Sequence, residues 1–253
     1  RKALRQQAHF RSETAGALAA AADQFVSRRD STKGETILAG YPFFEDWGRD
    51  TMIALPGICL STGRYETAKS ILRTFAVNER DGLMPNLFPE GGNEPMYNTA
   101  DAALLFINCV YLYFRKTWDT AFVEEMYPVM ERIVKGYMQG TRFGIHMDAD
   151  GLIAAGQGLD QVTWMDVRVG EILPTPRHGK PVEINASWYY ALRIMEALGR
   201  KAKADGCGPD YGVLAEQVKR SFTEKFWDQE RSCLKDVLPA MDAKKDSVET
   251  GSV

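Results

Sequence analysis

Two kinds of helical segment alternate along this chain, and this alternation constrains the fold more than any other feature. One kind carries its apolar side chains on a single face, at helical spacing. It occurs in residues 4–27, 64–79, 119–139 and 210–227. The other kind, apolar around most of its circumference, occurs in residues 51–60, 102–114 and 184–198. A helix that is hydrophobic all round is buried on all sides. The order therefore predicts helical hairpins with an inner and an outer member, arranged as a solenoid or a closed toroid.

Long connections lead into the inner helices, and short connections lead out of them. The long connections are residues 28–49, 80–98 and 140–182. Because each of them enters an inner helix at the same end, we expect all three to gather on one face of the scaffold. Long ordered loops on a rigid scaffold commonly carry function. No low-complexity or linker segment interrupts the chain, so we predict that residues 1–253 form one domain.

Charge and hydropathy argue against two classes of partner. The net charge is −3 and the isoelectric point is near 5.8, whereas nucleic-acid-binding proteins are normally basic. There is no basic stripe, and we interpret Arg28 and Arg29 as a solvated helix end. The longest apolar run, from Ala102 to Phe114, contains Asn108 and is too short to cross a bilayer. We therefore expect neither nucleic acid nor membrane as a partner.

The cysteines and histidines point to a reduced protein without a metal. The cysteines show no CxxC spacing, and two of them lie inside apolar runs, which predicts reduced, mostly buried thiols and a cytoplasmic location. They are Cys59, Cys109, Cys207 and Cys233. The histidines are far apart in the sequence and lack the spacing of metal ligands. They are His9, His146 and His178.

The three long loops share an unusual composition. They contain FFEDWGRD, DGLMPNLFPEGGNEPMYNTAD and DADGLIAAGQGLDQVTWMDVRVGEILPTPRHGKPVEIN. Each mixes carboxylates, amides, aromatic residues and glycines close to the start of an inner helix. Aromatic rings can stack on the C–H faces of a sugar, while carboxylates and amides bind its hydroxyls. The composition favours a sugar-binding site.

Several of these residues have a structural interpretation as well. Asp50 could cap a helix that begins at Thr51, and Asn98 or Thr99 could cap the next inner helix. Asp101 would then interact with the dipole of that helix, and Glu183 would do the same in the helix after it. Trp164 could be part of the core.

Asp166 is harder to explain as a structural residue. It lies between Met165 and Val167 and follows Trp164, with no cap or turn role. Apolar surroundings favour the protonated carboxyl group, which a general acid requires near neutral pH. The structural alternative is an ion pair with Arg168 or Arg177.

Long, ordered motifs connect the chain to a known family. AGYPFFEDWGRDTMIALPGICLSTGR, PNLFPE with YNTADAALLF, TWMD, and TPRHGKPVEINASWYYAL resemble the C-terminal amylo-α-1,6-glucosidase domain of glycogen debranching enzymes. The resemblance implies an all-α fold, an (α/α)6 toroid, of which this chain would supply about seven of about twelve helices. It also implies glycogen or a branched α-glucan as partner, and the rest of the enzyme at both ends of the chain. An incomplete toroid would leave inner-helix surface uncovered, which predicts self-association or a covering continuation.

The resemblance further implies an activity and its residues. Members of the family remove the single α-1,6-linked glucose left at a trimmed glycogen branch, by an inverting mechanism without a metal or organic cofactor. Asp166 would be the general acid, and Arg49 with Asp50 would hold the outer hydroxyls of the terminal glucose. The remaining substrate-binding residues that we predict are Trp47 and Trp164 as aromatic walls, with Asn98, Asp101, Glu183 and Asn185 near the pocket.

Two expectations concern the limits of this activity. We expect the general base to lie beyond Val253, so that this chain alone is inactive. Two other functions stay open from the residues themselves. One is a non-catalytic helical toroid that binds glucan or protein, and the other is a related, trehalase-like toroid that cleaves α-1,4 or α,α-1,1 bonds.

Overall fold

Helices make up most of the regular structure, as predicted. The structure is a computed structural model that describes residues 12–41, 43–89, 94–202 and 209–241. Its α-helices are α2 (Glu13–Ala22), α3 (Gly48–Leu55), α4 (Tyr65–Val77), α5 (Ala102–Thr117), α6 (Thr120–Gln139), α7 (Val182–Gly199) and α8 (Tyr211–Phe226). Shorter helical turns are η1 (Asp23–Phe25), the π-helical η2 (Pro56–Leu60) and η3 (Arg142–Gly144).

The strands are short and form antiparallel pairs. They are β1 (Val26–Arg28), β2 (Glu35–Ile37), β3 (His146–Met147), β4 (Ile153–Ala154), β5 (Lys180–Pro181), β6 (Trp227–Asp228), β7 (Cys233–Leu234) and β8 (Val237–Leu238). The pairs are β1 with β2, β3 with β4, β5 with β8, and β6 with β7. They stiffen the loops between helices and do not form a larger sheet among the described residues.

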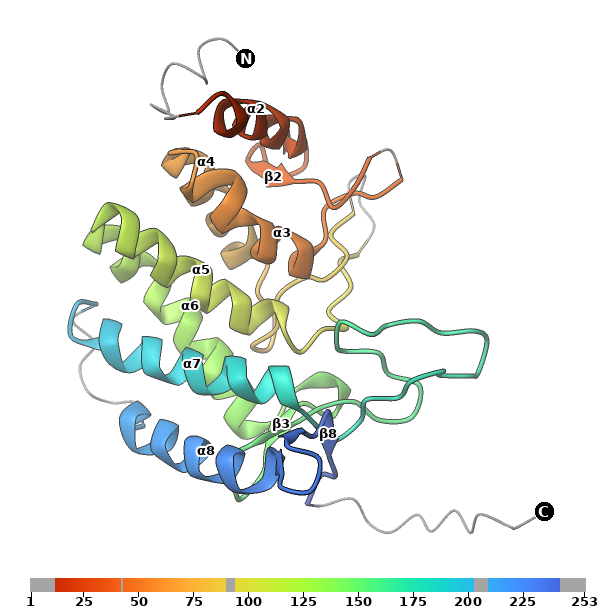
Figure 1. The fold of residues 1–253 in the computed structure, drawn as a ribbon. Helices are drawn as coiled ribbons and strands as arrows, with labels where there is room; N and C mark the ends of the chain where they lie inside the picture. The colour runs from red at the N-terminus through yellow and green to blue at the C-terminus, as the bar shows by residue number, and fades with distance from the viewer. Residues whose placement is uncertain (1–11, 42, 90–93, 203–208, 242–253) are drawn as a thin grey trace.

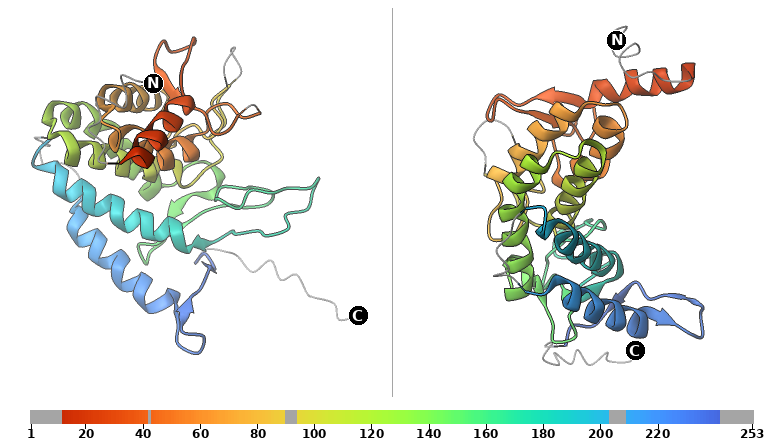
Figure 2. Two further views of the ribbon diagram at one scale, coloured as in Figure 1. Left: turned by 45° about the horizontal axis from the view of Figure 1, so that its top comes forward. Right: turned by 90° about the vertical axis from the view of Figure 1, so that its left-hand side faces the viewer.

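The helices follow one another in a curved row (Figures 1 and 2). In this row α3 packs on α5 and α5 packs on α7, so these three form the inner series. The helix α4 packs on α5, α6 lies against both α5 and α7, and α8 packs along α7. The predicted alternation of inner and outer helices is confirmed over this part of the chain.

The start of the chain differs from the prediction of a helix over residues 4–27. Residues 4–11 lie outside the described residues. The helix α2 begins after Ser12, whose Oγ accepts a hydrogen bond from the N–H of Ala15, and it ends at Ala22. Residues 26–28 then form β1, because Val26 pairs with Ile37 of β2 and this pairing places Ile37 in the core at 1% exposure. The Ala-rich pattern predicted the helix but placed its end too late, at residue 27 instead of Ala22.

Burial of the inner helices is less complete than their apolar sequences predict. Ile53 of α3 is 63% exposed and Tyr190 of α7 is 43% exposed, so the expectation that these helices are buried on all sides is wrong. The other expectation, that part of the inner-helix surface is uncovered, is confirmed for the described residues. The inner helix α5 is better covered than the other two, since its residues Phe106, Val110 and Tyr113 are buried in the core.

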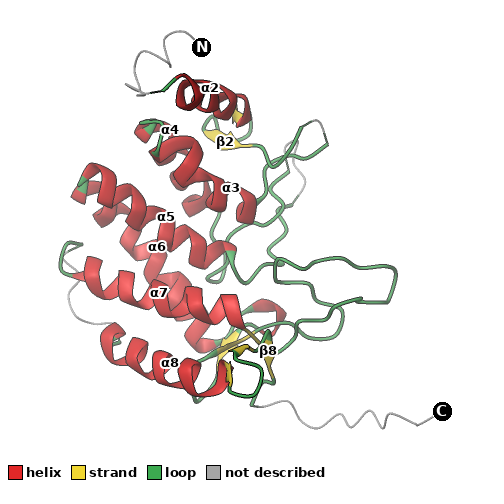
Figure 3. Cartoon of the chain, in the orientation of Figure 1, coloured by secondary structure: helices red, strands yellow, loops and turns green. Residues whose placement is uncertain are grey.

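The three long loops gather on one face of the helical scaffold, as predicted (Figure 3). The backbone N–H of Gly48, at the start of α3, donates to the carbonyl oxygen of Asn86 in the second loop at 2.6 Å. The N–H of Ala100 donates to the carbonyl oxygen of Val162 in the third loop at 2.7 Å. The second loop therefore contacts both of the others, and it links them at the starts of α3 and α5.

Arg29 corrects the interpretation of the Arg28–Arg29 pair as a solvated helix end. Its side chain is 2% exposed, forms an ion pair with the equally buried Asp46, and donates to the carbonyl oxygen of Phe88 at 2.8 Å. The guanidinium group also lies 3.8 Å from the centroid of the Phe88 ring. Burial raises the pKa of Asp46, although the charge of Arg29 and the hydrogen bond from Thr36 oppose the shift. This buried pair joins the first loop to the second.

The cysteine predictions can be compared in part. Cys59 and Cys109 are buried free thiols, as predicted, and burial raises the pKa of Cys59 to about 12. Cys233 is exposed, and Cys207 lies outside the described residues. Within the described residues, no helix is long and apolar enough to cross a membrane, and no three His, Cys, Asp or Glu side chains are grouped to hold a metal ion.

Candidate active site

The first turn of α3 presents charged side chains at the face where the loops meet. Trp47 occupies the N-cap position, and Arg49 and Asp50 follow in the first turn. A side chain at position 48 would not fit, since a Cβ atom there would lie 2.0 Å from the carbonyl oxygen of Pro85. The glycine of the DWGRD motif thus allows the second loop to pack directly on the start of the helix. Asp50 is not the N-cap, so the capping interpretation of this residue is wrong.

A cavity of about 380 Å³ opens beside this first turn. Its volume falls within the range of roughly 300–1,000 Å³ that is typical of small-molecule sites. It is lined by Ala39, Phe44, Trp47, Arg49, Asp50, Trp164 and Asp166. Five of the predicted site residues therefore meet at one cavity, although they come from two loops and a helix far apart in the sequence.

Arg49 links the elements around the cavity. Its Nε atom donates to Oδ2 of Asp101 at 2.6 Å, and its Nη2 atom donates to the carbonyl oxygen of Thr163 at 2.8 Å. Its Nη1 atom lies 3.3 Å from Oδ2 of Asp166. The guanidinium group is thus held between the start of α5 and the third loop, and it points one nitrogen at the predicted acid.

Asp50 lines the cavity, and the pKa of its carboxyl group is raised. Its side chain opens onto the cavity, yet the walls remove part of its hydration shell, and this burial raises the pKa of Asp50. The negative charges of Asp101 and Asp166 raise it further, whereas Arg49 and a backbone hydrogen bond lower it. The site therefore holds a carboxyl group that is easier to protonate than an ordinary aspartate.

The surroundings of Asp166 differ from the apolar setting that its sequence neighbours predict. Its side chain is 42% exposed, and both Trp164 and Val167 beside it are exposed as well. The ion pair with Arg168 or Arg177 that we considered as an alternative does not form, and Asp166 pairs with Arg49 instead. Arg168 instead donates to the carbonyl oxygen of Gly170, and Arg177 binds Glu183 and Asp236. The apolar residues beside Asp166 in the sequence do not bury it, because the loop turns Trp164 and Val167 toward the outside.

Four predicted substrate-binding residues do not line the cavity. Asn185 is fully buried, where its side-chain amide bonds both backbone groups of Ile153 and the carbonyl oxygen of Pro181. Glu183 lies in the first turn of α7 and accepts a hydrogen bond from Arg177 at 2.7 Å. Asn98 is half-buried, and its Oδ1 atom has no hydrogen-bond partner. Asp101 does not line the cavity either, but it contacts Arg49, which does.

Arg177 connects Glu183 to a wall of the cavity. Its side chain is 3% exposed, and its guanidinium carbon lies 5.6 Å from the centroid of the Trp164 ring. Asp236 binds the same guanidinium group from the segment that precedes β8. Glu183 is thus connected to the cavity wall through Arg177, which lies against Trp164.

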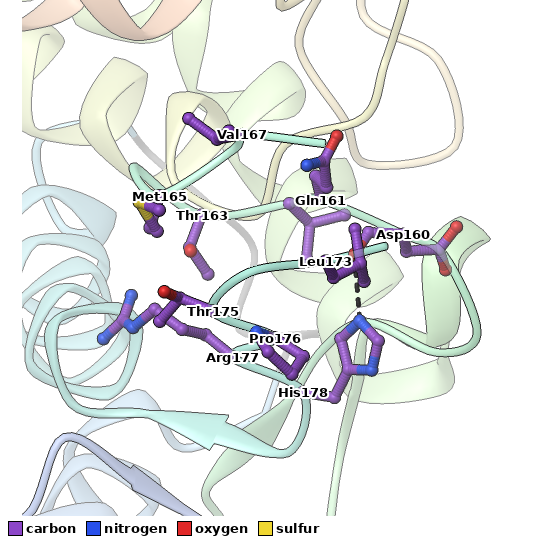
Figure 4. A pocket seen from close by; sticks show the side chains of 11 residues that line it. Asp160, Gln161, Thr163, Met165, Val167, Leu173, Thr175, Pro176, Arg177 and His178 are labelled. Atoms are coloured by element: carbon purple, nitrogen blue, oxygen red, sulfur yellow. Dashed lines mark hydrogen bonds between the residues drawn. The ribbon is translucent and has the colours of Figure 1, made fainter. Parts of the chain in front are cut away.

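The third loop is closed at its base by its own contacts. Ala155 and Gly179 exchange backbone hydrogen bonds of 2.7 and 3.1 Å, and His178 Nε2 donates to the carbonyl oxygen of Asp160 at 2.9 Å. Figure 4 shows the interior of the loop, where Thr163, Leu173 and Thr175 surround a small pocket. These contacts fix the segment from which Trp164 and Asp166 project.

Sequence reasoning missed three contributors to the site. Ala39 and Phe44 line the cavity, and Thr163 offers its backbone carbonyl to Arg49. Phe44 was visible in the FFEDWGRD motif as an aromatic residue beside charges. The other two carry no signal, because one is an alanine and the other acts through its backbone.

Carboxyl groups, a guanidinium group and two tryptophan rings meet at one cavity on a helical scaffold, an arrangement suited to binding a sugar. Sequence comparison specifies the family. The chain belongs to the amylo-alpha-1,6-glucosidase family, whose sequence model matches residues 20–250.

Proteins that are similar to this chain include one curated enzyme and two solved structures. The glycogen debranching enzyme of Saccharomyces cerevisiae is 31% identical over 81% of this chain, and the chain spans only 18% of that relative's length. The crystal structure of a GH78 family rhamnosidase of Bacillus sp. GL1 matches 70% of this chain and 17% of the rhamnosidase chain, with a TM-score of 0.54 and 18% identity. A rhamnosidase from Klebsiella oxytoca with rhamnose bound matches 67% of this chain and 31% of its own, with a TM-score of 0.46 and 17% identity. The likeness to the Bacillus enzyme shows a shared helical fold.

Proposed function

We propose that this chain provides the glucose-binding part of a site that hydrolyses terminal α-1,6-linked glucose at branch stubs of glycogen or a similar α-glucan. The observation that carries the proposal is the meeting of Arg49, Asp50 and Asp166 at one cavity beside Trp47 and Trp164. The name of the yeast relative, a glycogen debranching enzyme, supports the choice of substrate. We also propose that α2–α8 form part of an (α/α)6 toroid, which their inner and outer arrangement supports.

Five of the residues that line the cavity have a role in this proposal. Arg49 donates to hydroxyl groups of the terminal glucose, and Asp50 accepts from them. Trp47 and Trp164 flank the sugar ring. Asp166 donates a proton to the glycosidic oxygen, so that the bond to the leaving glucan chain breaks as water attacks the opposite face of the glucose.

Inversion of this kind requires a second carboxylate, about 6.5–9.5 Å from the first, to activate the water. Glu183 is already bound to Arg177, and Asp50 is assigned to the sugar hydroxyls. We therefore propose that the base comes from a part of the whole protein outside the described residues. A chain that lacks the base would bind glucose without hydrolysing the glucan.

The experiment uses the whole protein and a limit dextrin that carries single α-1,6-linked glucose stubs, with released glucose as the readout. General acid catalysis contributes about 10²–10⁴-fold, so Asp166→Asn should lower the rate of glucose release by that factor. Binding of 1-deoxynojirimycin, a glucose mimic, should stay within a few-fold of the parent, because this role of Asp166 is in proton transfer. The matched control is Glu171→Gln, which removes an exposed acid from the same loop.

Two outcomes would contradict the proposal. Near-normal glucose release by Asp166→Asn would remove this residue from the acid role. Binding of the dextrin by the whole parent protein without any release of glucose would favour the non-catalytic glucan-binding function instead.

A further inference from the structure

We propose that Asp101 is a positioning residue that holds the guanidinium group of Arg49 in its sugar-binding orientation and does not itself touch the sugar. This inference rests on the proposed function of Arg49. It assigns to Asp101 a role different from the substrate contact predicted from the sequence. The observation behind it is the 2.6 Å hydrogen bond from Nε of Arg49 to Oδ2 of Asp101. The side chain of each of these two residues is 11% exposed.

Asp101 is a suitable anchor because its own position is fixed from several sides. It occupies the N-cap position of α5, and its second carboxylate oxygen accepts a hydrogen bond from the hydroxyl group of Thr99. The preceding residue, Ala100, donates its N–H to Val162 at 2.7 Å and accepts from the hydroxyl group of the buried Tyr137 at 2.8 Å. The carboxylate therefore projects from backbone that cannot shift without breaking these bonds.

The geometry at Arg49 explains what the anchor achieves. A guanidinium group has five N–H donors in a rigid plane, so fixing two of its nitrogen atoms fixes the direction of the third. Asp101 holds Nε and the carbonyl oxygen of Thr163 holds Nη2, and as a result Nη1 points toward Asp166. Without Asp101 the long side chain could rotate about its flexible stem, and fewer molecules would present Nη1 to the cavity.

Asp101 lies behind Arg49 as seen from the cavity. It is absent from the cavity lining, whereas Arg49, Asp50 and Asp166 all belong to it. A direct contact between Asp101 and a sugar in the cavity would require Arg49 to move aside. The two residues should therefore act on sugar affinity as one unit.

A double-mutant cycle on binding of 1-deoxynojirimycin by the whole protein tests this inference, with titration calorimetry well below the melting temperature of each variant. Arg49→Met and Asp101→Asn should each weaken binding about 10- to 100-fold, the range for a hydrogen bond to a charged group. In the Arg49→Met background, Asp101→Asn should change the affinity less than about two-fold. A purely structural role of Asp101 would not produce this dependence on Arg49.

The matched control is Asp119→Asn. Asp119 is also a helix N-cap, accepts from the N–H of Phe122, and pairs with Lys69 at 2.9 Å, but it lies on the outer helix α6. This variant should lower the melting temperature and leave the affinity for 1-deoxynojirimycin unchanged.

The possible outcomes separate the inference from the function on which it rests. An unchanged affinity in Arg49→Met would overturn the proposed sugar-binding role of Arg49, and the positioning role of Asp101 with it. Weak binding by Arg49→Met together with normal binding by Asp101→Asn would overturn the positioning role alone. The same would follow if Asp101→Asn weakened binding equally in both backgrounds, since Asp101 would then act independently of Arg49.

Discussion

Arg49 and Asp166 touch each other through a contact of 3.3 Å that spans 117 positions of sequence. Arg49, proposed to bind the sugar, and Asp166, the proposed acid, therefore interact electrostatically before any sugar is bound. Because the side chain of Asp166 is 42% exposed, water screens this ion pair, and pairs of this kind contribute little stability. A sugar hydroxyl can thus replace the carboxylate on Nη1 with little loss of free energy.

Asp50 should make the fold less stable at neutral pH. The pKa of its carboxyl group is raised in the folded protein, so ionisation favours the unfolded chain as the pH rises above the ordinary value of an aspartate, and this effect is complete above the folded-state pKa. Asp50→Asn should therefore raise the melting temperature at pH 7. The difference from the parent should shrink as the pH falls through the folded-state pKa toward the ordinary value of an aspartate.

Thermal melts of both proteins between pH 7 and pH 3 check this prediction. Glu66→Gln is a useful contrast, since Glu66 is an exposed acid in the first turn of α4, away from the cavity. It should lower the melting temperature slightly, through loss of its interaction with the helix dipole. A lower melting temperature for Asp50→Asn at pH 7 would contradict the prediction.

The buried pair of Arg29 and Asp46 should be important for stability. Replacing Arg29 with Met leaves the carboxylate of Asp46 buried without its cation, which typically destabilises a protein by about 3–5 kcal/mol. Arg28→Met, at the exposed neighbouring position, should change the free energy of unfolding by less than about 0.5 kcal/mol. Urea denaturation of the two variants measures both values, and equal effects would argue against the buried pair.

Gly136 should be required inside α6 by the backbone packed against it. A Cβ atom at this position would lie 2.8 Å from the carbonyl oxygen of Asp81, so Gly136→Ala should destabilise by about 1–3 kcal/mol, although alanine favours helices. Gly57 in η2 has no atom within 4 Å of the corresponding position. Gly57→Ala should therefore stabilise the protein by about 0.5–1 kcal/mol. Opposite signs in chemical denaturation are the expected result.

Asn185 should support the backbone rather than bind the sugar. Asn185→Ala would leave the backbone groups of Ile153 and the carbonyl oxygen of Pro181 without their partner, with an expected loss of about 2–4 kcal/mol in the free energy of unfolding. Asn98→Ala should have a smaller effect, because its Oδ1 atom has no hydrogen-bond partner to lose. The affinity of folded Asn185→Ala for 1-deoxynojirimycin should stay close to that of the parent. A large loss of affinity with normal stability would restore the sugar contact predicted from the sequence.

The helices could be predicted from the sequence because their signals are local and repeated. The residues of α4, α6 and α8 place their apolar side chains on one face at helical spacing, and Asp119 and Asp210 cap α6 and α8 at their starts. The strand β1 could not be predicted in this way. Val26 continues an Ala-rich helical pattern, and only its pairing with the distant Ile37 turns the segment into a strand.

The candidate site was predictable in its residue types but not in its contacts. The motifs around Arg49 and Asp166 mark both residues, yet nothing local indicates that they meet or that Asp101 lies behind them. Arg29 looked like a surface residue, because its buried partner Asp46 follows 17 positions later across a strand hairpin. Interactions of this kind depend on how loops pack, which hydrophobic periodicity does not encode.

The three hydrogen bonds of Arg49 also have a consequence for folding. They join α3 to residues 52, 114 and 117 positions further along the chain. Closing such long segments is entropically unfavourable until the intervening helices have packed, so contacts of this kind form late. We expect the cavity to appear only in the final stage of folding, after the helical row is in place. Binding of a glucose mimic during refolding would then report completion of the native state, whereas recovery of helical circular dichroism would precede it.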